Sequence, residues 1–134
     1  MTDTFIETTL IAALKTLTTL ITDSNVAWPN EAFPQDLENG WYEVHFLPGE
    51  PSQVELGTGS TNRWVGIFQI DLCVPLNIGK AMINARYDAL AVLFARGAIF
   101  NGVKIEKIYR GPDDPGSDHY RLPVRIEYRA DLSN

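Results

Sequence analysis

The segment from Arg63 to Val74 constrains the fold most, because it is the clearest strand in the sequence. Alternate residues give it one face made of Trp64, Gly66, Phe68, Ile70, Leu72 and Val74. The opposite face carries Val65, Ile67 and Cys73 and is interrupted by Gln69 and Asp71. Apolar residues on both faces predict a central strand of a sheet, covered at least in part on both sides.

Two amphipathic helices are predicted on either side of the first strands. Apolar residues at steps of three and four run from Ile6 to Ile21, with Thr4 and Glu7 at capping-box spacing and a polar stop at 23–25. A second helix is predicted from a cap at Asn77 to about Ala95. Its stripe consists of Ile83, Tyr87, Leu90 and Phe94, and Gly97 is placed to end it.

Three further strands are predicted at Trp41–Leu47, Val103–Arg110 and Tyr120–Arg129. The order α-β-β-α-β-β indicates an α+β fold. We expect a mostly antiparallel four-stranded sheet made of two hairpins, with both helices packed on one face. Pro123 cannot donate a hydrogen bond to a neighbouring strand, so the last strand is predicted to be bulged there or to form a sheet edge. Pairing with a second copy is one way to cover such an edge.

The chain is predicted to form one domain over residues 1–134. Its 134 residues, 45% hydrophobic and 21% charged, are typical of an ordinary globular domain. The one irregular stretch is 49–62, which contains Pro51, Gly57 and Gly59 and is predicted to be a long flexible loop. Such a loop either orders on assembly or is a mobile loop without a role.

Charge and composition exclude some classes of partner. With 11 basic and 17 acidic residues the net charge is −6, which disfavours nucleic-acid binding through phosphate contacts. The first residues do not resemble a signal peptide, and no segment has the ~20 apolar residues of a membrane helix. We therefore expect a soluble protein that does not associate with membranes. A single cysteine suits a reducing compartment.

The sequence contains no motif that predicts catalysis, a cofactor or a metal. His45, His119 and Cys73 lack zinc-ligand spacing, and Asp113, Asp114 and Asp118 suit a polar turn better than a calcium loop. The segment 76–80 contains Gly-Lys before a helix but lacks the first glycine of a phosphate-binding loop. If the chain were a small ligand-binding or hydrolytic domain, His45 with Asp71 would be the first pair to inspect.

Several short motifs occur in an order that is more specific than any of them alone. They are the N-terminal helix, Trp28-Pro29-Asn30-Glu31-Ala32-Phe33, Trp41-Tyr42-Glu43-Val44, Leu56-Gly57, Gly66-Ile67-Phe68-Gln69-Ile70-Asp71-Leu72 with Pro75 and Gly79, and Ile126-Glu127-Tyr128-Arg129. With these motifs the chain resembles the tail terminator, or tail completion, proteins of long-tailed bacteriophages.

The resemblance implies a structural virion protein and not an enzyme. Its members form a ring, expected to be a hexamer, on the head-proximal end of the tail tube, where they stop polymerisation and prepare the tail for head joining. The implied partners are further copies of the chain, the major tail tube protein and the head–tail connector. Assembly is expected in the host cytoplasm, and the mature location is the neck-proximal end of the virion tail. A head–tail joining protein of the neck remains the alternative.

A ring subunit needs interfaces, and the outward face of the sheet and the loop over 49–62 are the candidates. Residues predicted to contact another subunit or the tail tube are Glu50, Gln53, Glu55, Arg63, Arg121 and Arg125. The other interpretation of these charges is a solvated face held by cross-strand ion pairs.

Overall fold

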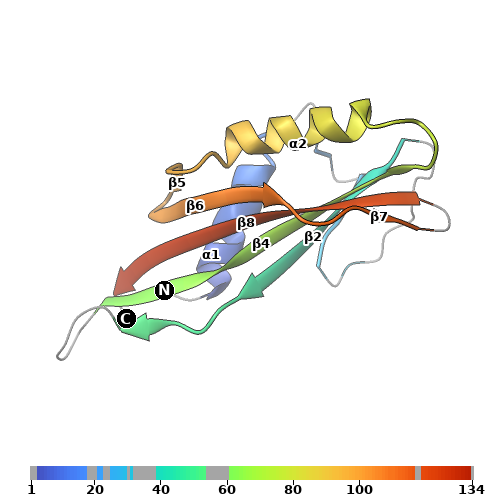
Figure 1. The fold of residues 1–134 in the computed structure, drawn as a ribbon. Coiled ribbons are helices and arrows are strands. Elements are labelled where there is room, and N and C mark those ends of the chain that lie inside the picture. Colours follow the sequence, from blue (N-terminus) through green and yellow to red (C-terminus); the bar gives the residue numbers. More distant parts are fainter. Residues whose placement is uncertain are drawn as a thin grey trace.

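The computed structural model describes residues 3–17, 21–22, 25–29, 31, 39–53, 61–116 and 119–133. Its elements are α1 (Asp3–Leu14), β1 (Val26–Ala27), β2 (Trp41–Pro48), β3 (Ser52–Gln53), β4 (Thr61–Pro75), α2 (Ala81–Leu93), β5 (Ile99–Phe100), β6 (Val103–Arg110), β7 (Asp114–Pro115) and β8 (His119–Ser133). The strands form one sheet in the order β1-β2-β4-β8-β6-β5, with β3 paired to β4 and β7 paired to β8. The sheet is strongly twisted and curled (Figure 1).

The predicted four-stranded, mostly antiparallel sheet was wrong. The sheet is mixed, because β1 runs parallel to β2, and its main path contains six strands. The additional strands β1, β3, β5 and β7 have two residues each, too few to produce an alternating pattern. One of them had a local signal that could have revealed it. Asn101 and Gly102 both have positive φ (49° and 87°), which makes the two-residue turn that joins β5 to β6.

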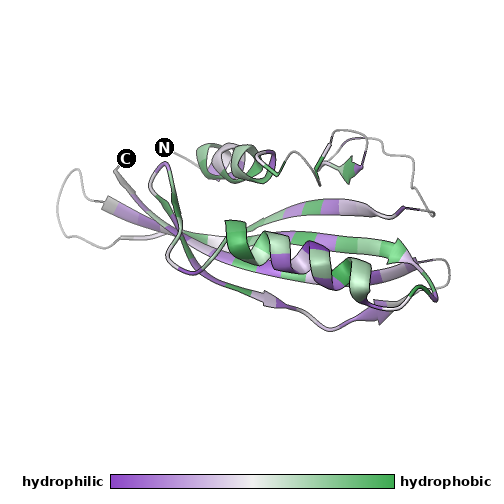
Figure 2. Ribbon diagram, turned by 90° about the horizontal axis from the view of Figure 1, so that it is seen from above, coloured by the Kyte–Doolittle hydropathy of each residue, from purple (hydrophilic) through white to green (hydrophobic). Residues whose placement is uncertain are grey.

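Both helices pack against the same face of the sheet and share its core. Ile6, Leu10 and Leu14 of α1 and Ile83 and Leu90 of α2 are buried with the inward side chains of β4 and β8. The inward row of β4 is Phe68, Ile70, Leu72 and Val74, and that of β8 is Leu122, Val124, Ile126 and Tyr128. Hydrophobic and hydrophilic residues alternate along the strands (Figure 2). We call the face of the sheet that the two helices cover the inner face. The opposite face is the outer face.

Both helices are shorter than their apolar stripes predicted. The first helix ends at Leu14. Just after it, the Thr16 hydroxyl donates a 2.6 Å hydrogen bond to the Ala13 carbonyl, which competes with helical backbone hydrogen bonding. The predicted stop at 23–25 is therefore misplaced, and residues 18–20 and 23–24 lie outside the described residues. Thr4 lies inside α1 and does not cap it. The predicted cap of the second helix, Asn77, was also wrong. Asn77 adopts a left-handed conformation with φ of 64°, and α2 begins after Lys80, which is its N-cap residue.

Pro123 had suggested that the last strand is bulged or forms an edge of the sheet. It does not form an edge. β8 pairs with β4 over its whole length and with β6 and β7 on its other side. Pro123 lies between the end of β6 and the start of β7, and its carbonyl accepts a 2.7 Å hydrogen bond from the Gly111 amide. The N and O atoms of a strand residue face the same neighbouring strand. The N–H that Pro123 lacks would therefore point into the gap between β6 and β7, where no described strand pairs with β8. The register shift occurs instead in β6, between Ile105 and Lys107.

Gly66 allows three elements to pass close to one another. A Cβ atom at this position would collide with the Tyr128 hydroxyl and lie 2.7 Å from the Leu47 carbonyl oxygen. The Tyr128 ring can therefore cross β4 and stack on Phe46, with ring centroids 5.6 Å apart. This glycine supports packing at a place where the strand pattern alone would accept a larger residue.

The predicted loop over 49–62 is partly paired strand. Ser52 lies opposite Arg63 and Gln53 opposite Asn62, and β4 continues out to Thr61, opposite Ser133 of β8. Residues 54–60 lie outside the described residues. This end of β3, β4 and β8, which we call the projecting arm, extends away from both helices (Figure 1).

Candidate functional site

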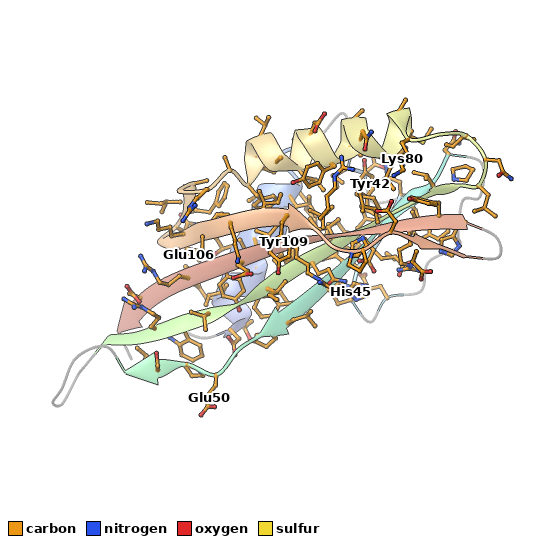
Figure 3. The ribbon with its side chains drawn as sticks, viewed as in Figure 1. Tyr42, His45, Glu50, Lys80, Glu106 and Tyr109 are labelled. Atoms are coloured by element: carbon orange, nitrogen blue, oxygen red, sulfur yellow. The ribbon has the colours of Figure 1, made fainter. Side chains whose placement is uncertain are left out.

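A polar cluster occupies the outer face where β2, β4 and β8 lie side by side. Glu43 and His45 come from β2, Asp71 from β4 and Arg121 from β8; these four residues are the carboxylate–arginine cluster. The register places Glu43 opposite Asp71, and Cys73 opposite both Trp41 and Arg121. His45 points outward from β2 in Figure 3. The pair His45 and Asp71, singled out from the sequence, is therefore brought together.

Arg121 is the centre of this cluster. Its Nη1 donates to Glu43 Oε1 at 2.9 Å and to Asp71 Oδ2 at 2.8 Å, and its Nη2 donates to Glu43 Oε2 at 3.0 Å. His45 Nε2 lies 3.3 Å from Asp71 Oδ2 and 4.0 Å from Glu43 Oε1. Two neutral side chains complete the shell, because Trp41 Nε1 donates to Glu43 and Gln69 Nε2 donates to Asp71, both at 2.9 Å.

The carboxylates of the cluster are largely shielded from water although none of the described helices covers them, whereas the His45 side chain is 44% exposed. Asp71 is only 5% exposed, and Trp41 and Cys73 are buried. The ring of His119 packs on Trp41 at a centroid distance of 4.8 Å. Burial raises the pKa of Glu43, but hydrogen bonds from Arg121 and Trp41 outweigh it and hold this pKa below its ordinary value. The hydrogen bond to Glu43 also raises the pKa of Arg121, so the pair is ionised across the ordinary pH range.

The geometry fits a salt-bridge network better than a metal centre. Ligand atoms of Glu43, His45 and Asp71 lie within 4.8 Å of one another, as metal ligands do. However, Arg121 Nη1 already bridges the two carboxylate oxygens, Glu43 Oε1 and Asp71 Oδ2, that an ion would share.

The thiol beside the cluster is not suited to nucleophilic catalysis. Cys73 Sγ lies 3.6 Å from Glu43 Oε2, and its side chain is fully buried. Burial raises the pKa of Cys73 well above its ordinary value, so the reactive thiolate is suppressed. The His45–Asp71 pair therefore has no activated thiol at its side.

One aspartate of the predicted polar turn, Asp113, has structural partners. Asp113 accepts hydrogen bonds from Tyr120 and from Lys80, the latter at 3.2 Å, and these bonds lower the pKa of Asp113. Lys80, in the segment that resembled part of a phosphate-binding loop, is thereby paired with an acid. Asp118 lies outside the described residues.

The predicted interface residues separate into two groups. Arg121 and Arg125 lie on the outer face of β8, and Arg125 Nε donates to Gln69 Oε1 at 3.3 Å. Arg63, Gln53 and Glu50 lie toward the projecting arm, where Arg63 pairs with Asp131 at 2.9 Å. Glu55 lies outside the described residues. The interface role of all six residues stays a prediction.

The sequence did not reveal Trp41 and His119 as members of the site. Trp41 was assigned as the start of a strand and as part of a family motif, and was not considered as a site residue. The available signal was the alternation of Trp41, Glu43 and His45, which places all three on the face opposite Tyr42 and Val44.

Comparisons with known proteins agree with this fold and with the resemblance. One solved structure is similar over 98% of this chain and 97% of its own, with a TM-score of 0.75 and 17% identity, which establishes a shared fold. No curated protein matches the chain. Within the described residues, no helix is long and apolar enough to cross a membrane. A family model described as phage tail terminator protein matches residues 5–128. The predicted resemblance is therefore confirmed, and the chain belongs to this family of phage tail structural proteins, which are not enzymes.

Proposed function

We propose that this protein caps the head-proximal end of a phage tail tube, ends polymerisation of the tube protein and prepares the tail for joining to the head. The observation that carries the proposal is the family match over residues 5–128. The protein would assemble in the host cytoplasm and remain at the neck-proximal end of the virion tail. The carboxylate–arginine cluster supports a structural role, because Arg121 already bridges the two carboxylates that a metal ion would need.

In this proposal the working form is a ring, expected to be a hexamer, that contacts the tube protein on one side and the head–tail connector on the other. We assign the tube contact to the projecting arm with Glu50, Gln53 and Arg63. The Arg63–Asp131 ion pair supports this assignment, because both side chains are more than a third exposed and lie beyond the helices. Arg125, which lies midway along β8 opposite Gln69, is the candidate for a contact with another copy on the outer face.

Deleting the gene and imaging the tails by electron microscopy tests this function. We expect tails of abnormal and variable length, because nothing stops addition of tube subunits, and recovery of uniform length when the intact gene is supplied. Tails of normal, uniform length in the deletion strain would contradict termination. Finding the protein on tail-free heads in the same preparations would support the neck alternative instead.

A further inference from the structure

Within the described residues, the sheet has two edges to which a further strand could add. We call them the β2 margin, which is the side of β2 that faces away from β4, and the β5 margin, which is the side of β5 that faces away from β6. β1 pairs only with Tyr42 and Glu43, so in the described part of the chain the side of β2 that faces away from β4 is unpaired beyond Glu43. The Tyr42 amide donates to Asn25 on the β1 side, and by alternation the N–H and C=O of Phe46 face the same way. At the other margin, β5 ends the path of strands among the described residues. Both margins therefore present backbone groups that can accept another strand.

The side chains at the two margins match face by face. Beside β2, Trp28, Pro29, Phe46 and Leu47 line a groove of about 370 Å³, and Leu47 on the outer face is 48% exposed. On β5, Ile99 lies opposite Lys104 and faces outward, where it is 65% exposed. Phe100 lies opposite the buried Val103 and faces inward, as Phe46 does. If β5 added in parallel to β2 with Ile99 opposite Leu47, Phe100 would lie opposite Pro48 and diagonal to Phe46, so apolar side chains would meet on each face.

The charges of the two margins are also complementary. On the β2 margin, Glu50 follows the end of the strand. The β5 margin carries Arg96 before the strand and Lys104 opposite Ile99. A groove of about 380 Å³ between β5 and α1, lined by small residues that include Ala12 and Thr16, leaves room beside β5 for an arriving strand.

We propose that β5 of one copy adds to the open edge of β2 in the next copy, with Ile99 seated beside Leu47. This inference rests on the proposed ring and assigns the surfaces that build it. Strand addition supplies main-chain hydrogen bonds, and the pocket for Ile99 fixes the position of the incoming strand. Because each copy offers one margin of each kind, the contact is head-to-tail and repeats around the ring until it closes.

A cysteine pair tests the contact directly. The double variant Leu47→Cys/Ile99→Cys should form disulfides between copies on mild oxidation, giving a ladder from dimer to full ring on a denaturing gel. Each single variant should stay largely monomeric on the same gel. Cys73 can be retained, because it is fully buried.

A matched pair of lysine substitutions measures the interface in sedimentation velocity. Ile99→Lys should weaken association by about 30-fold or more, as expected for a central apolar contact. Ile78→Lys should leave association unchanged, because Ile78 is 46% exposed in the turn between β4 and α2 and lies on neither margin. Thermal melts verify that both variants are folded.

Two results would overturn the inference. The first is a ring that survives Ile99→Lys and shows no Leu47–Ile99 cross-link, which leaves the proposed function intact. The second is a wild-type protein that remains monomeric at its highest soluble concentration. A ring that cross-links as expected, combined with normal tail length in the deletion strain, would instead contradict the proposed function alone.

Discussion

Arg121 holds two carboxylates that are largely withdrawn from water. Replacing it with alanine leaves Glu43 and Asp71 close together without their shared cation, although Asp71 is only 5% exposed. We expect Arg121→Ala to lower the free energy of unfolding by about 3 kcal/mol, because breaking a buried pair leaves uncompensated charge. Arg125→Ala is the matched control and should cost less than about 0.5 kcal/mol. Equal costs in urea denaturation would show that the cluster does not stabilise the fold.

Glu43 makes stability depend on acid pH. Its folded-state pKa lies below the ordinary value of 4.5, so its contribution is fully present above pH 4.5. The contribution is lost as pH falls through the lower, folded-state pKa. The variant Glu43→Gln should therefore lose less stability than the wild type between neutral pH and the acid range, while being less stable at neutral pH. Parallel stability curves, measured by urea denaturation at a series of pH values, would rule this out.

At the scale of elements, Gly66 controls how β2 and the Tyr128 side chain meet β4. We expect Gly66→Ala to destabilise the protein by about 1–3 kcal/mol, because the new methyl group would overlap the Tyr128 hydroxyl and the Leu47 carbonyl. Gly49→Ala is a milder control, since its Cβ would lie 3.0 Å from the nearest atom, the Val65 carbonyl oxygen. Chemical denaturation of both variants measures the difference, and a Gly66→Ala variant as stable as Gly49→Ala contradicts the expectation.

The long elements could be predicted from the sequence, because β4, β6 and β8 alternate over enough residues to show their period. Two-residue strands have no period, and only the Asn101-Gly102 turn marked one of them. Pro123 was misinterpreted because the sequence cannot show that β6 ends beside it.

The site was harder to predict than the strands. Arg121 was chosen for its charge, but its contacts with Glu43 and Asp71 depend on the register of β2, β4 and β8, which no local pattern fixes.

On the scale of the whole molecule, a head-to-tail ring makes a prediction that a two-fold contact does not. In Ile99→Lys the β5 margin is blocked but the β2 margin is intact, and in Leu47→Lys the reverse holds. Leu47 is 48% exposed on the outer face, so lysine can be accommodated there in the folded chain. Each variant alone should therefore be monomeric, because every contact needs one intact margin of each kind.

An equal mixture of the two variants retains one productive combination, β5 of Leu47→Lys with β2 of Ile99→Lys. The complex formed there exposes only blocked margins, so growth should stop at a one-to-one dimer, measurable by sedimentation velocity or native mass spectrometry. If the contact instead joined two identical margins, one of the variants would dimerise by itself through its intact margin. The mixture thus distinguishes a closed head-to-tail ring from two-fold pairing without requiring the tail.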